Sequence, residues 1–473
     1  MSRRIAIIGA GPGGYVAAVR AAQKRAEVTV IEKENVGGTC LNSGCVPSKI
    51  MKTTAHMVEK LRHGAEFGVD IDGSVSVNMG NLMKRKKKIL DAQSQGILGL
   101  FSSHNIRYVK ATACIKERGI VTAASADGTS EDIPYDNLIL AMGTSPLNIP
   151  LFPFDGKKIL SSNHLLSLTE IPESIMIVGG GVIGCEFAFI LSVLGSKVTV
   201  VEAMNRLLPI PSVDESCSKL IQREMKKRKI NFFTDQAVDK VEDVGDKLSV
   251  HIGNSPFSDK EKKRVVVSVS KMAVCVGRAS NAPGTGLEKI GVNVSESGWI
   301  QVNDRMETHV PGVYAIGDIT GPERVMLAHV ASTEGEVAVD NIMGDAREMK
   351  YNVIPGGIFT MPEIGNIGLS EGQAKEAGYR VRSDSVLFRR LAKAQLLGEL
   401  AGEAKIVSDG DTGKILGVHI TGPHATDLIA EGVLAVQKGI TVKELADTIH
   451  AHPTLAEIML EAAFKADDRP LHG

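Results

Sequence analysis

One pattern of residues occurs twice in this chain and constrains how two parts of it can fold. A short apolar run at residues 5–8 enters a glycine-rich turn at residues 9–14, and a helical stretch and a second apolar run follow, ending at Glu32. The same arrangement returns at residues 179–184 and ends at Glu202, with the same interval between the first glycine and the acid. A strand, a glycine turn, a helix and a second strand form a parallel unit with a right-handed crossover. The sequence therefore predicts two α/β modules of the same kind.

The glycines of the first turn indicate what this module binds. Gly9 allows the tight turn, Gly11 lets the backbone approach a pyrophosphate, and Gly14 permits close packing of the helix. The N-terminus of the helix favours negatively charged phosphates, and Glu32 can accept a hydrogen bond from a ribose hydroxyl. A glycine turn alone is a weak signal, but together with the strands, the helix and the acid it predicts a dinucleotide site.

The second module repeats this chemistry at Gly179, Gly181, Gly184 and Glu202, so we expect a second, separate dinucleotide. A carboxylate at the position of Glu202 accepts from a ribose 2′-hydroxyl and repels a 2′-phosphate. That preference favours NAD over NADP, although Arg206 lies close by in the sequence and could weaken it.

Just after the first module, Cys40 and Cys45 lie five positions apart. In a regular helix this separation places the two Cα atoms on the order of 9 Å apart, whereas a disulfide requires less than about 7 Å. If the two residues pair, the chain between them cannot be regular helix, and Asn-Ser-Gly at 42–44 permits a break. A disulfide that closes so small a loop adds little stability, so such a pair would be a redox couple. For an arbitrary pair of cysteines, two buried thiols would be the more common interpretation.

The sequence around these cysteines resembles a known redox motif. Residues 37–49 read Gly-Gly-Thr-Cys-Leu-Asn-Ser-Gly-Cys-Val-Pro-Ser-Lys, which is similar to the motif of the flavin-dependent disulfide reductases. The form Leu-Asn-x-Gly-Cys-x-Pro-Ser-Lys is most similar to that of the dihydrolipoamide dehydrogenases. The resemblance implies a redox-active disulfide between Cys40 and Cys45, with FAD in the first module and NAD in the second. It also implies an α/β fold with two Rossmann-like dinucleotide-binding domains and a C-terminal α+β dimerisation domain.

Further motifs extend the resemblance along the chain. An apolar run that turns at Gly143 and another that ends at Asp318 resemble the second and the late flavin signatures of the family. In the family the aspartate binds the ribityl chain of FAD, and a helix that starts near Ala328 lies beside the flavin pyrimidine ring. Gly277 occupies a strand-and-turn segment of the NAD module. These matches imply a divided flavin domain. We expect an FAD-binding domain at 1–147 and 277–348, an NAD-binding domain at 148–276 and a dimerisation domain at 349–473.

The resemblance also implies roles around the cysteines. Cys45 is expected against the flavin, where its thiolate forms a charge-transfer contact, and Cys40 is expected to exchange with the substrate. Lys49 is expected near the flavin N5, paired with Glu186 on the helix of the NAD module. An exposed ion pair of little energetic value is the alternative interpretation of these two charges.

Thiol chemistry of this kind also requires a base, because the thiolate is the nucleophile. The ordinary pKa of histidine lies close enough to neutrality for this role. His452 is followed by Glu457, which can hold one ring nitrogen and leave the other as the base; His450 is the competing candidate. The pattern His-Pro-x-x-x-Glu matches the family and favours His452. In the family this base comes from the partner subunit, which implies a homodimer.

Composition excludes several classes of function. The net charge of −1 gives no reason to expect binding to nucleic acid or to a membrane surface. The basic run at 84–88 is interpreted as a solvated helix face, and no apolar run is long enough to span a bilayer. The remaining cysteines are interpreted as structural thiols, and we expect no metal site. The first strand begins almost at the first residue, so we expect no leader in the given sequence and a cytoplasmic location, unless a presequence has already been removed.

The combined prediction is an NAD-dependent flavoprotein that oxidises dihydrolipoamide to lipoamide on lipoyl-bearing subunits of 2-oxo-acid dehydrogenase or glycine cleavage complexes. One alternative is a related reductase for glutathione or a similar thiol, which would use NADPH and require basic residues near Glu202. Another is a mainly structural subunit of a 2-oxo-acid dehydrogenase complex. The presence of Cys40, Cys45, His452 and Glu457 argues against a purely structural role.

Overall fold

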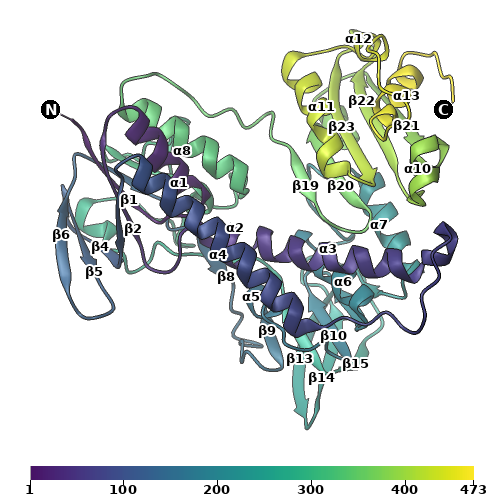
Figure 1. Ribbon diagram of the computed structural model, residues 1–473, viewed down its shortest axis with the longest axis horizontal. Coiled ribbons are helices and arrows are strands. Elements are labelled where there is room, and N and C mark those ends of the chain that lie inside the picture. Colours follow the sequence, from purple (N-terminus) through teal and green to yellow (C-terminus); the bar gives the residue numbers. More distant parts are fainter. Residues whose placement is uncertain (1, 473) are drawn as a thin grey trace.

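The computed structural model describes residues 2–472 and has three parts, which lie at different positions in Figure 1. The first part, the flavin-side module, is built on a parallel sheet in the order β18-β7-β1-β2-β3. Its strands are β1 (Arg4–Ile8), β2 (Glu27–Glu32), β3 (Arg107–Lys110), β7 (Asn137–Leu140) and β18 (Val313–Ala315). Strand β18 comes from far along the chain, so the second part is inserted into the first.

Both faces of this sheet are covered, which explains why its central strand is apolar and buried from Ile5 to Ile8. Helices α1 (Pro12–Gln23) and α8 (Ala328–Ile342) lie side by side on one face, although they are distant in sequence (Figure 1). Ile5 and Ile7 of β1 pack into this helical layer, with α4 (Met79–Ser103) also on this side. The other face is covered by an antiparallel sheet of β4 (Thr112–Glu117), β5 (Ile120–Ala124) and β6 (Ser130–Pro134).

The second part, the nucleotide-side module, repeats this plan. Its parallel sheet has the order β12-β11-β10-β16-β9, and the antiparallel strands β13, β14 and β15 cover one face. Helices α6 and α7 cover the other face. The bounds are β9 (Ile159–Ser161), β10 (Ser174–Val178), β11 (Lys197–Val201), β12 (Asn231–Phe233), β13 (Gln236–Val244), β14 (Lys247–Asn254), β15 (Val265–Val269), β16 (Lys271–Val274), α5 (Ser162–Leu165), α6 (Val182–Leu194) and α7 (Glu215–Lys227). Strands β8 (Thr144–Pro146) and β17 (Arg278–Ser280) pair where the chain passes between the two modules.

The third part, the C-terminal domain, is an antiparallel sheet in the order β19-β20-β23-β22-β21. Helix α11 packs on β20 and β23, and α13 packs on β21 and β22. The bounds are β19 (Gly356–Ile358), β20 (Glu363–Gly368), β21 (Val381–Leu387), β22 (Glu403–Asp409), β23 (Ile415–Gly422), α9 (Glu371–Glu376), α10 (Ala392–Leu397), α11 (Ala425–Lys438), α12 (Val442–Ala446) and α13 (Glu457–Ala466). The expected fold class is confirmed; the domain boundaries stay predictions.

One helix joins the modules. Helix α2 (Gly38–Ser43) is followed at once by α3 (Cys45–Arg62), which leaves the flavin-side module and packs against α6. Met51, Ala55 and Val58 of α3 share one buried cluster with Phe189 of α6. This packing places the start of α3, with its cysteine, where the two modules meet. Within residues 2–472, no helix is both long and apolar enough to cross a membrane.

Candidate redox and cofactor site

The two cysteines lie on either side of a break between helices. Helix α2 ends at Ser43, Gly44 leaves the helical conformation, and α3 begins at Cys45. A side chain at position 44 would place its Cβ 2.8 Å from the carbonyl oxygen of Thr39, so the break depends on glycine. Both cysteines are free thiols here. The chain between them is not one regular helix, so the obstacle that a regular helix would present to pairing is absent.

The two thiols differ in acidity. The hydrogen bond from Cys40 lowers the pKa of Cys45 to about 7, with help from the charge of Lys49 and against the effects of burial and of Glu186. The same hydrogen bond, together with burial and the charge of Cys45, raises the pKa of Cys40. Near neutral pH the arrangement therefore favours a thiolate on Cys45 and a protonated thiol on Cys40.

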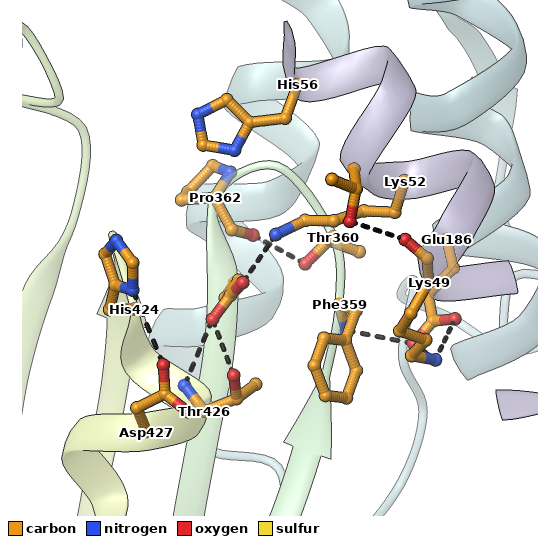
Figure 2. A network of polar contacts seen from close by, with 12 residues as sticks. Lys49, Lys52, His56, Glu186, Phe359, Thr360, Pro362, His424, Thr426 and Asp427 are labelled. Atoms are coloured by element: carbon orange, nitrogen blue, oxygen red, sulfur yellow. Dashed lines mark hydrogen bonds and ion pairs between the residues drawn. The ribbon is translucent and has the colours of Figure 1, made fainter. Parts of the chain in front are cut away.

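Helix α3 carries a lysine one turn after Cys45 that joins three parts of the molecule. Nζ of Lys49 donates to both carboxylate oxygens of Glu186 on α6, at 3.0 and 2.8 Å. The backbone N–H of Phe359, in the C-terminal domain, donates to the same carboxylate at 2.9 Å. The ring of Phe359 lies under the ammonium, 4.3 Å from Nζ to the ring centre. Figure 2 shows these three side chains converging between the modules.

A second lysine follows on the same helix. Nζ of Lys52 lies 2.5 Å from Oε1 of Glu363 on β20, and both side chains are largely buried. The other oxygen of Glu363 accepts from Oγ1 of Thr426 at 2.7 Å and from its backbone N–H at 3.3 Å. Lys52 and Thr426 lie on facing elements in Figure 2. The pair therefore ties α3 to the first turn of α11.

The acids at the ends of β2 and β11 make matching bonds. Oε2 of Glu32 accepts from the N–H of Ala10 at 2.8 Å, and Oε2 of Glu202 accepts from the N–H of Gly180 at 2.6 Å. In each case Oε1 accepts from the backbone N–H two residues further on. A carboxylate oxygen has two lone pairs, so each acid can hold its own loop and still accept from a ribose hydroxyl.

The glycine loops leave room where a pyrophosphate would approach. A Cβ added at Gly11 would come no closer than 3.9 Å to any neighbouring atom, and one at Gly181 would have nothing within 4 Å. A Cβ at Gly14 or Gly184 would instead lie 1.9 Å from the carbonyl oxygen of the first glycine of its loop. The first and last glycines of each loop therefore allow the close packing of the loop, and the middle glycine, Gly11 or Gly181, leaves space for a pyrophosphate. The residues present fit two bound dinucleotides.

Three helices that the sequence assigned to cofactors begin in the same way. Helices α1, α6 and α8 have no side-chain hydrogen bond at their N-caps, so N–H groups of their first turns are free to bind an anionic ligand. Ala328 is the first residue of α8. The turns at Gly143 and Gly277 both have positive φ, +60° and +138°, with open space around the position of a Cβ.

Asp318 lies at the start of a short 3₁₀ helix, and its surroundings reveal a residue that the sequence reasoning missed. Oδ2 of Asp318 accepts from Oγ1 of Thr144 at 3.0 Å. Arg278 donates to Oγ1 and to the carbonyl oxygen of Thr144, at 2.6 and 2.7 Å, and its Nε lies 3.8 Å from Asp318. It also reaches Thr39, next to Cys40, at 3.5 Å. The only sequence signal for Arg278 was its position directly after the open turn at Gly277.

The histidine and glutamate near the C-terminus form a pair. Nδ1 of His452 lies 2.8 Å from Oε1 of Glu457, and the N–H of Thr454 donates to the other oxygen at 2.8 Å. The His452 side chain is 71% exposed, which leaves its Nε2 accessible. Its loop belongs to the C-terminal domain, and among the interactions of residues 2–472 none joins His452 to either cysteine.

His450, the competing base, is held differently. Its Nε2 lies 2.9 Å from Oε1 of Glu431 and its Nδ1 lies 2.9 Å from the carbonyl oxygen of Thr448, so both ring nitrogens are engaged. The side chain is only 6% exposed. A base that must meet a substrate thiol needs a free, accessible nitrogen. The geometry therefore favours His452 over His450.

Two parallel dinucleotide modules, a thiol pair between them and a C-terminal sheet domain define the class of flavin- and nucleotide-dependent disulfide oxidoreductases. Residues 3–335 match the family model described as "Pyridine nucleotide-disulphide oxidoreductase", and residues 354–463 match its dimerisation domain. The chain belongs to the pyridine nucleotide-disulphide oxidoreductase family. It is an oxidoreductase whose cofactors are FAD and NAD.

Similar proteins span nearly the whole chain. A dihydrolipoyl dehydrogenase of Chlamydia trachomatis is 39% identical, covering 98% of this chain and 97% of its own. One of Bacillus subtilis is 38% identical, covering 99% and 98%. Among solved structures, LpdA from Mycobacterium tuberculosis superposes with a TM-score of 0.88 at 28% identity, covering 98% of this chain and 99% of its own.

Proposed function

We propose that this enzyme oxidises dihydrolipoamide to lipoamide and reduces NAD. The observation that carries the proposal is the thiol pair at the break between α2 and α3, with the pKa of Cys45 lowered to about 7. The named relatives with about the same length support the substrate, since two of them at 39% and 38% identity are dihydrolipoyl dehydrogenases.

His452, Cys40 and Cys45 carry out a thiol–disulfide exchange with dihydrolipoamide. His452 takes a proton from one thiol of dihydrolipoamide, and the resulting thiolate attacks Sγ of Cys40, which breaks the Cys40–Cys45 bond and releases Cys45 as a thiolate. The second thiol of dihydrolipoamide then attacks the lipoyl sulfur of the mixed disulfide. This breaks the bond to Cys40, and Cys40 takes up the proton of that thiol. Lipoamide departs oxidised, and the two cysteines hold the electron pair. The charge of Lys49 favours the thiolate on Cys45.

The cofactors complete the reaction when bound. FAD and NAD together supply the transfer of this electron pair, as a hydride, to the nicotinamide. Gly9, Gly11, Gly14 and Glu32 would hold FAD at the pyrophosphate and the ribose, with Gly143, Asp318, Lys49 and the start of α8 at Ala328 around the rest of it. Gly179, Gly181, Gly184, Glu202 and Gly277 would hold NAD, with Glu186 at the junction of the two sites.

The partners follow from the site. The dimerisation domain supports a homodimer, and we infer that each base acts on the cysteines of the other subunit, because His452 is exposed and makes no contact with its own cysteines. The lipoyl group would arrive on subunits of 2-oxo-acid dehydrogenase or glycine cleavage complexes. The cytoplasmic location stays a prediction.

A glutathione-type reductase with NADPH is the rival function. The buried carboxylate of Glu202 stands where a 2′-phosphate would be repelled. Arg206 is held within its own loop, where one terminal nitrogen donates to the carbonyl oxygens of Ile210 and Val213, at 3.0 Å each. The carboxylate of Glu202 favours NAD and therefore the lipoamide reaction.

Two assays on the flavin-loaded enzyme test the proposal. Dihydrolipoamide is offered with NAD or NADP, and oxidised glutathione with NADH or NADPH. We expect fast reduction of NAD by dihydrolipoamide, lost in Cys45→Ser. Activity only with glutathione and NADPH would overturn the proposal. Flavin-loaded protein that is inactive with every pair would instead favour a structural subunit.

A further inference from the structure

The segment that presents His452 has a single inward-facing side chain. Residues 447–453 connect α12 to the turn before α13, and we call them the base loop. Every residue of the base loop is exposed except His450. Ile449 is 97% exposed and the His452 side chain 71%, whereas the His450 side chain is 6% exposed. His450 is therefore the anchor that fixes the base loop to the body of the domain.

The two hydrogen-bond acceptors that face the His450 ring indicate which protonation state the ring has. Nδ1 faces the carbonyl oxygen of Thr448, which can only accept a hydrogen bond, and Nε2 faces Oε1 of Glu431, which as a carboxylate also only accepts. A neutral imidazole has one N–H and could satisfy only one of them. Both contacts are at 2.9 Å, so the geometry requires an imidazolium with two N–H donors.

The charges around the ring support a stable cation. The hydrogen bond to Glu431 raises the pKa of His450 most, and the Thr448 carbonyl and the charges of Glu431 and Glu457 add to it, against the effect of burial. The charged groups that act on the ring are thus Glu431 on α11 and Glu457 on α13. In turn, the pKa of Glu457 is below its ordinary value: burial raises it, but His452, the N–H of Thr454 and the charge of His450 outweigh burial.

The helix that holds His450 is itself anchored. Glu431 lies on α11, whose first turn is bound by Glu363, and Glu363 is paired with Lys52 on α3. The anchor of the base loop is therefore connected by named contacts to the helix that begins at Cys45. Within one chain, His450 is the buried contact of the base loop, and contacts at both ring nitrogens lock its side chain in place.

We propose that His450 is a positioning residue that acts as a permanent imidazolium: paired with Glu431, it orients the base loop and keeps Glu457 ionised beside His452. Ionised Glu457 accepts from Nδ1–H of His452 and leaves Nε2 unprotonated as the base. The inference rests on the proposed function, but the charge of His450 can be measured without it.

The charge is measured by NMR on the dimeric, flavin-loaded enzyme labelled with ¹⁵N-histidine. The His450 signals are identified by their absence in His450→Gln. We expect both nitrogens protonated at pH 7.5 in the wild type, and a neutral ring at that pH in Glu431→Gln. A neutral His450 ring in the wild type would overturn the inference, whether or not the enzyme oxidises dihydrolipoamide.

Kinetics test the positioning role. In His450→Gln and in Glu431→Gln we expect dihydrolipoamide oxidation to fall about tenfold, while NADH oxidation by an artificial electron acceptor, which needs no base, is unchanged. In His450→Gln the acid limb of the pH profile moves to higher pH, because the charge of His450 no longer helps to lower the pKa of Glu457. Lys443→Gln, which removes an exposed ion pair with Asp447, the first residue of the base loop, without touching His450, serves as the control and changes neither activity.

The other outcomes overturn the inference. An unchanged acid limb with an unchanged rate would show that His450 does not position the base. An equal loss of both activities would show a general structural role. A complete loss of dihydrolipoamide oxidation at all pH values in His450→Gln, together with retained activity in His452→Gln, would make His450 the base. Failure of the proposed function would be seen separately, as wild-type enzyme that does not oxidise dihydrolipoamide.

Discussion

The ammonium of Lys49 lies 2.8 Å from Oε2 of Glu186, across the boundary between α3 and α6. The glutamate side chain is 7% exposed, so its negative charge is held inside the protein by this lysine and by the N–H of Phe359. Both charges act on Cys45, with opposite effects: Lys49 lowers the pKa of the thiol and Glu186 raises it. The two charges of the ion pair thus act in opposite directions on the acidity of the thiol at the start of the same helix, in addition to the larger effect of Cys40.

Removal of Lys49 and removal of Glu186 should therefore shift the pKa of Cys45 in opposite directions. In Lys49→Met the pKa of Cys45 rises from about 7, and in Glu186→Gln it falls, because the remaining charge is unopposed. The measurement is the rate of alkylation of Cys45 in the reduced enzyme as a function of pH, with the labelled cysteine identified by mass spectrometry. We expect the midpoints to move by about one pH unit. Midpoints that move in the same direction would contradict this account.

Substitutions in the second glycine loop should affect NAD binding and protein stability separately. In Gly181→Ala the added methyl has nothing within 4 Å, so stability is unchanged, but the methyl occupies the path of the pyrophosphate and raises the KM for NAD at least about tenfold. In Gly184→Ala the Cβ would lie 1.9 Å from the carbonyl oxygen of Gly179, which costs at least about 2 kcal/mol of stability. Thermal unfolding and steady-state kinetics distinguish the two.

The first module offers the matched control. Gly11 and Gly14 stand in the same environments as Gly181 and Gly184, so Gly11→Ala should lower the bound flavin content while leaving the KM for NAD unaffected in the molecules that retain flavin. If Gly181→Ala destabilised the protein as much as Gly184→Ala, the assignment of open space to the pyrophosphate would be wrong.

Features within one module could be predicted from sequence because they repeat a local pattern. Glu32 and Glu202 lie at the same interval after their first glycine, and the structure gives both the same backbone partners. Pairs that join modules follow no local pattern, and the Lys49–Glu186 pair was expected only from the resemblance to the family. Lys52 meets Glu363 and Lys405 meets Asp214 only because separate parts of the chain pack together, and no periodicity in the chain encodes that packing.

The choice between the two histidines shows another limit. His450 and His452 are neighbours with an acid nearby, so residue type and spacing alone left both as candidates. The difference lies in the direction of each ring: His450 turns inward to Glu431, and His452 turns outward with one nitrogen bound by Glu457. Ring direction depends on the path of the base loop and on the position of α11, which a sequence pattern does not describe.

Asp214 connects the nucleotide-side module to the C-terminal domain, and its removal should destabilise the protein. Oδ1 accepts from the N–H of Ser216 at 3.0 Å at the start of α7, and Oδ2 accepts from the N–H of Glu371 at 3.1 Å at the start of α9. Lys405 lies 3.1 Å from Oδ1, and the two side chains are 12% and 4% exposed. Asp214→Asn leaves the buried lysine with less compensation, and we expect a loss of about 3 kcal/mol at pH 7 in urea unfolding.

The pH dependence of that loss follows from the acidity of Asp214. Burial raises the pKa of this carboxyl, but the two backbone N–H donors and the charges of His419 and Lys405 bring it well below its ordinary value. A depressed folded pKa contributes stability above the unfolded value, about 3.9, and loses it as the pH falls. The difference between wild type and Asp214→Asn should therefore shrink below about pH 4. A difference that does not depend on pH would contradict the role of the charge.

Exchange of subunits tests which chain supplies the base. Cys45→Ser and His452→Gln each inactivate their own homodimer. Suppose that each His452 serves the cysteines of its partner. In a heterodimer of the two variants, one site then combines the intact cysteines of the His452→Gln chain with the intact His452 of the Cys45→Ser chain. The other site lacks both Cys45 and His452. The heterodimer, purified through two different affinity tags, should then show about half the wild-type activity with dihydrolipoamide and NAD, since a twofold dimer has two equivalent sites. If each His452 served its own chain, both sites of the heterodimer would lack one group, and no activity would return. The His452→Gln homodimer should still oxidise NADH with an artificial acceptor, which shows that its flavin is bound and functional.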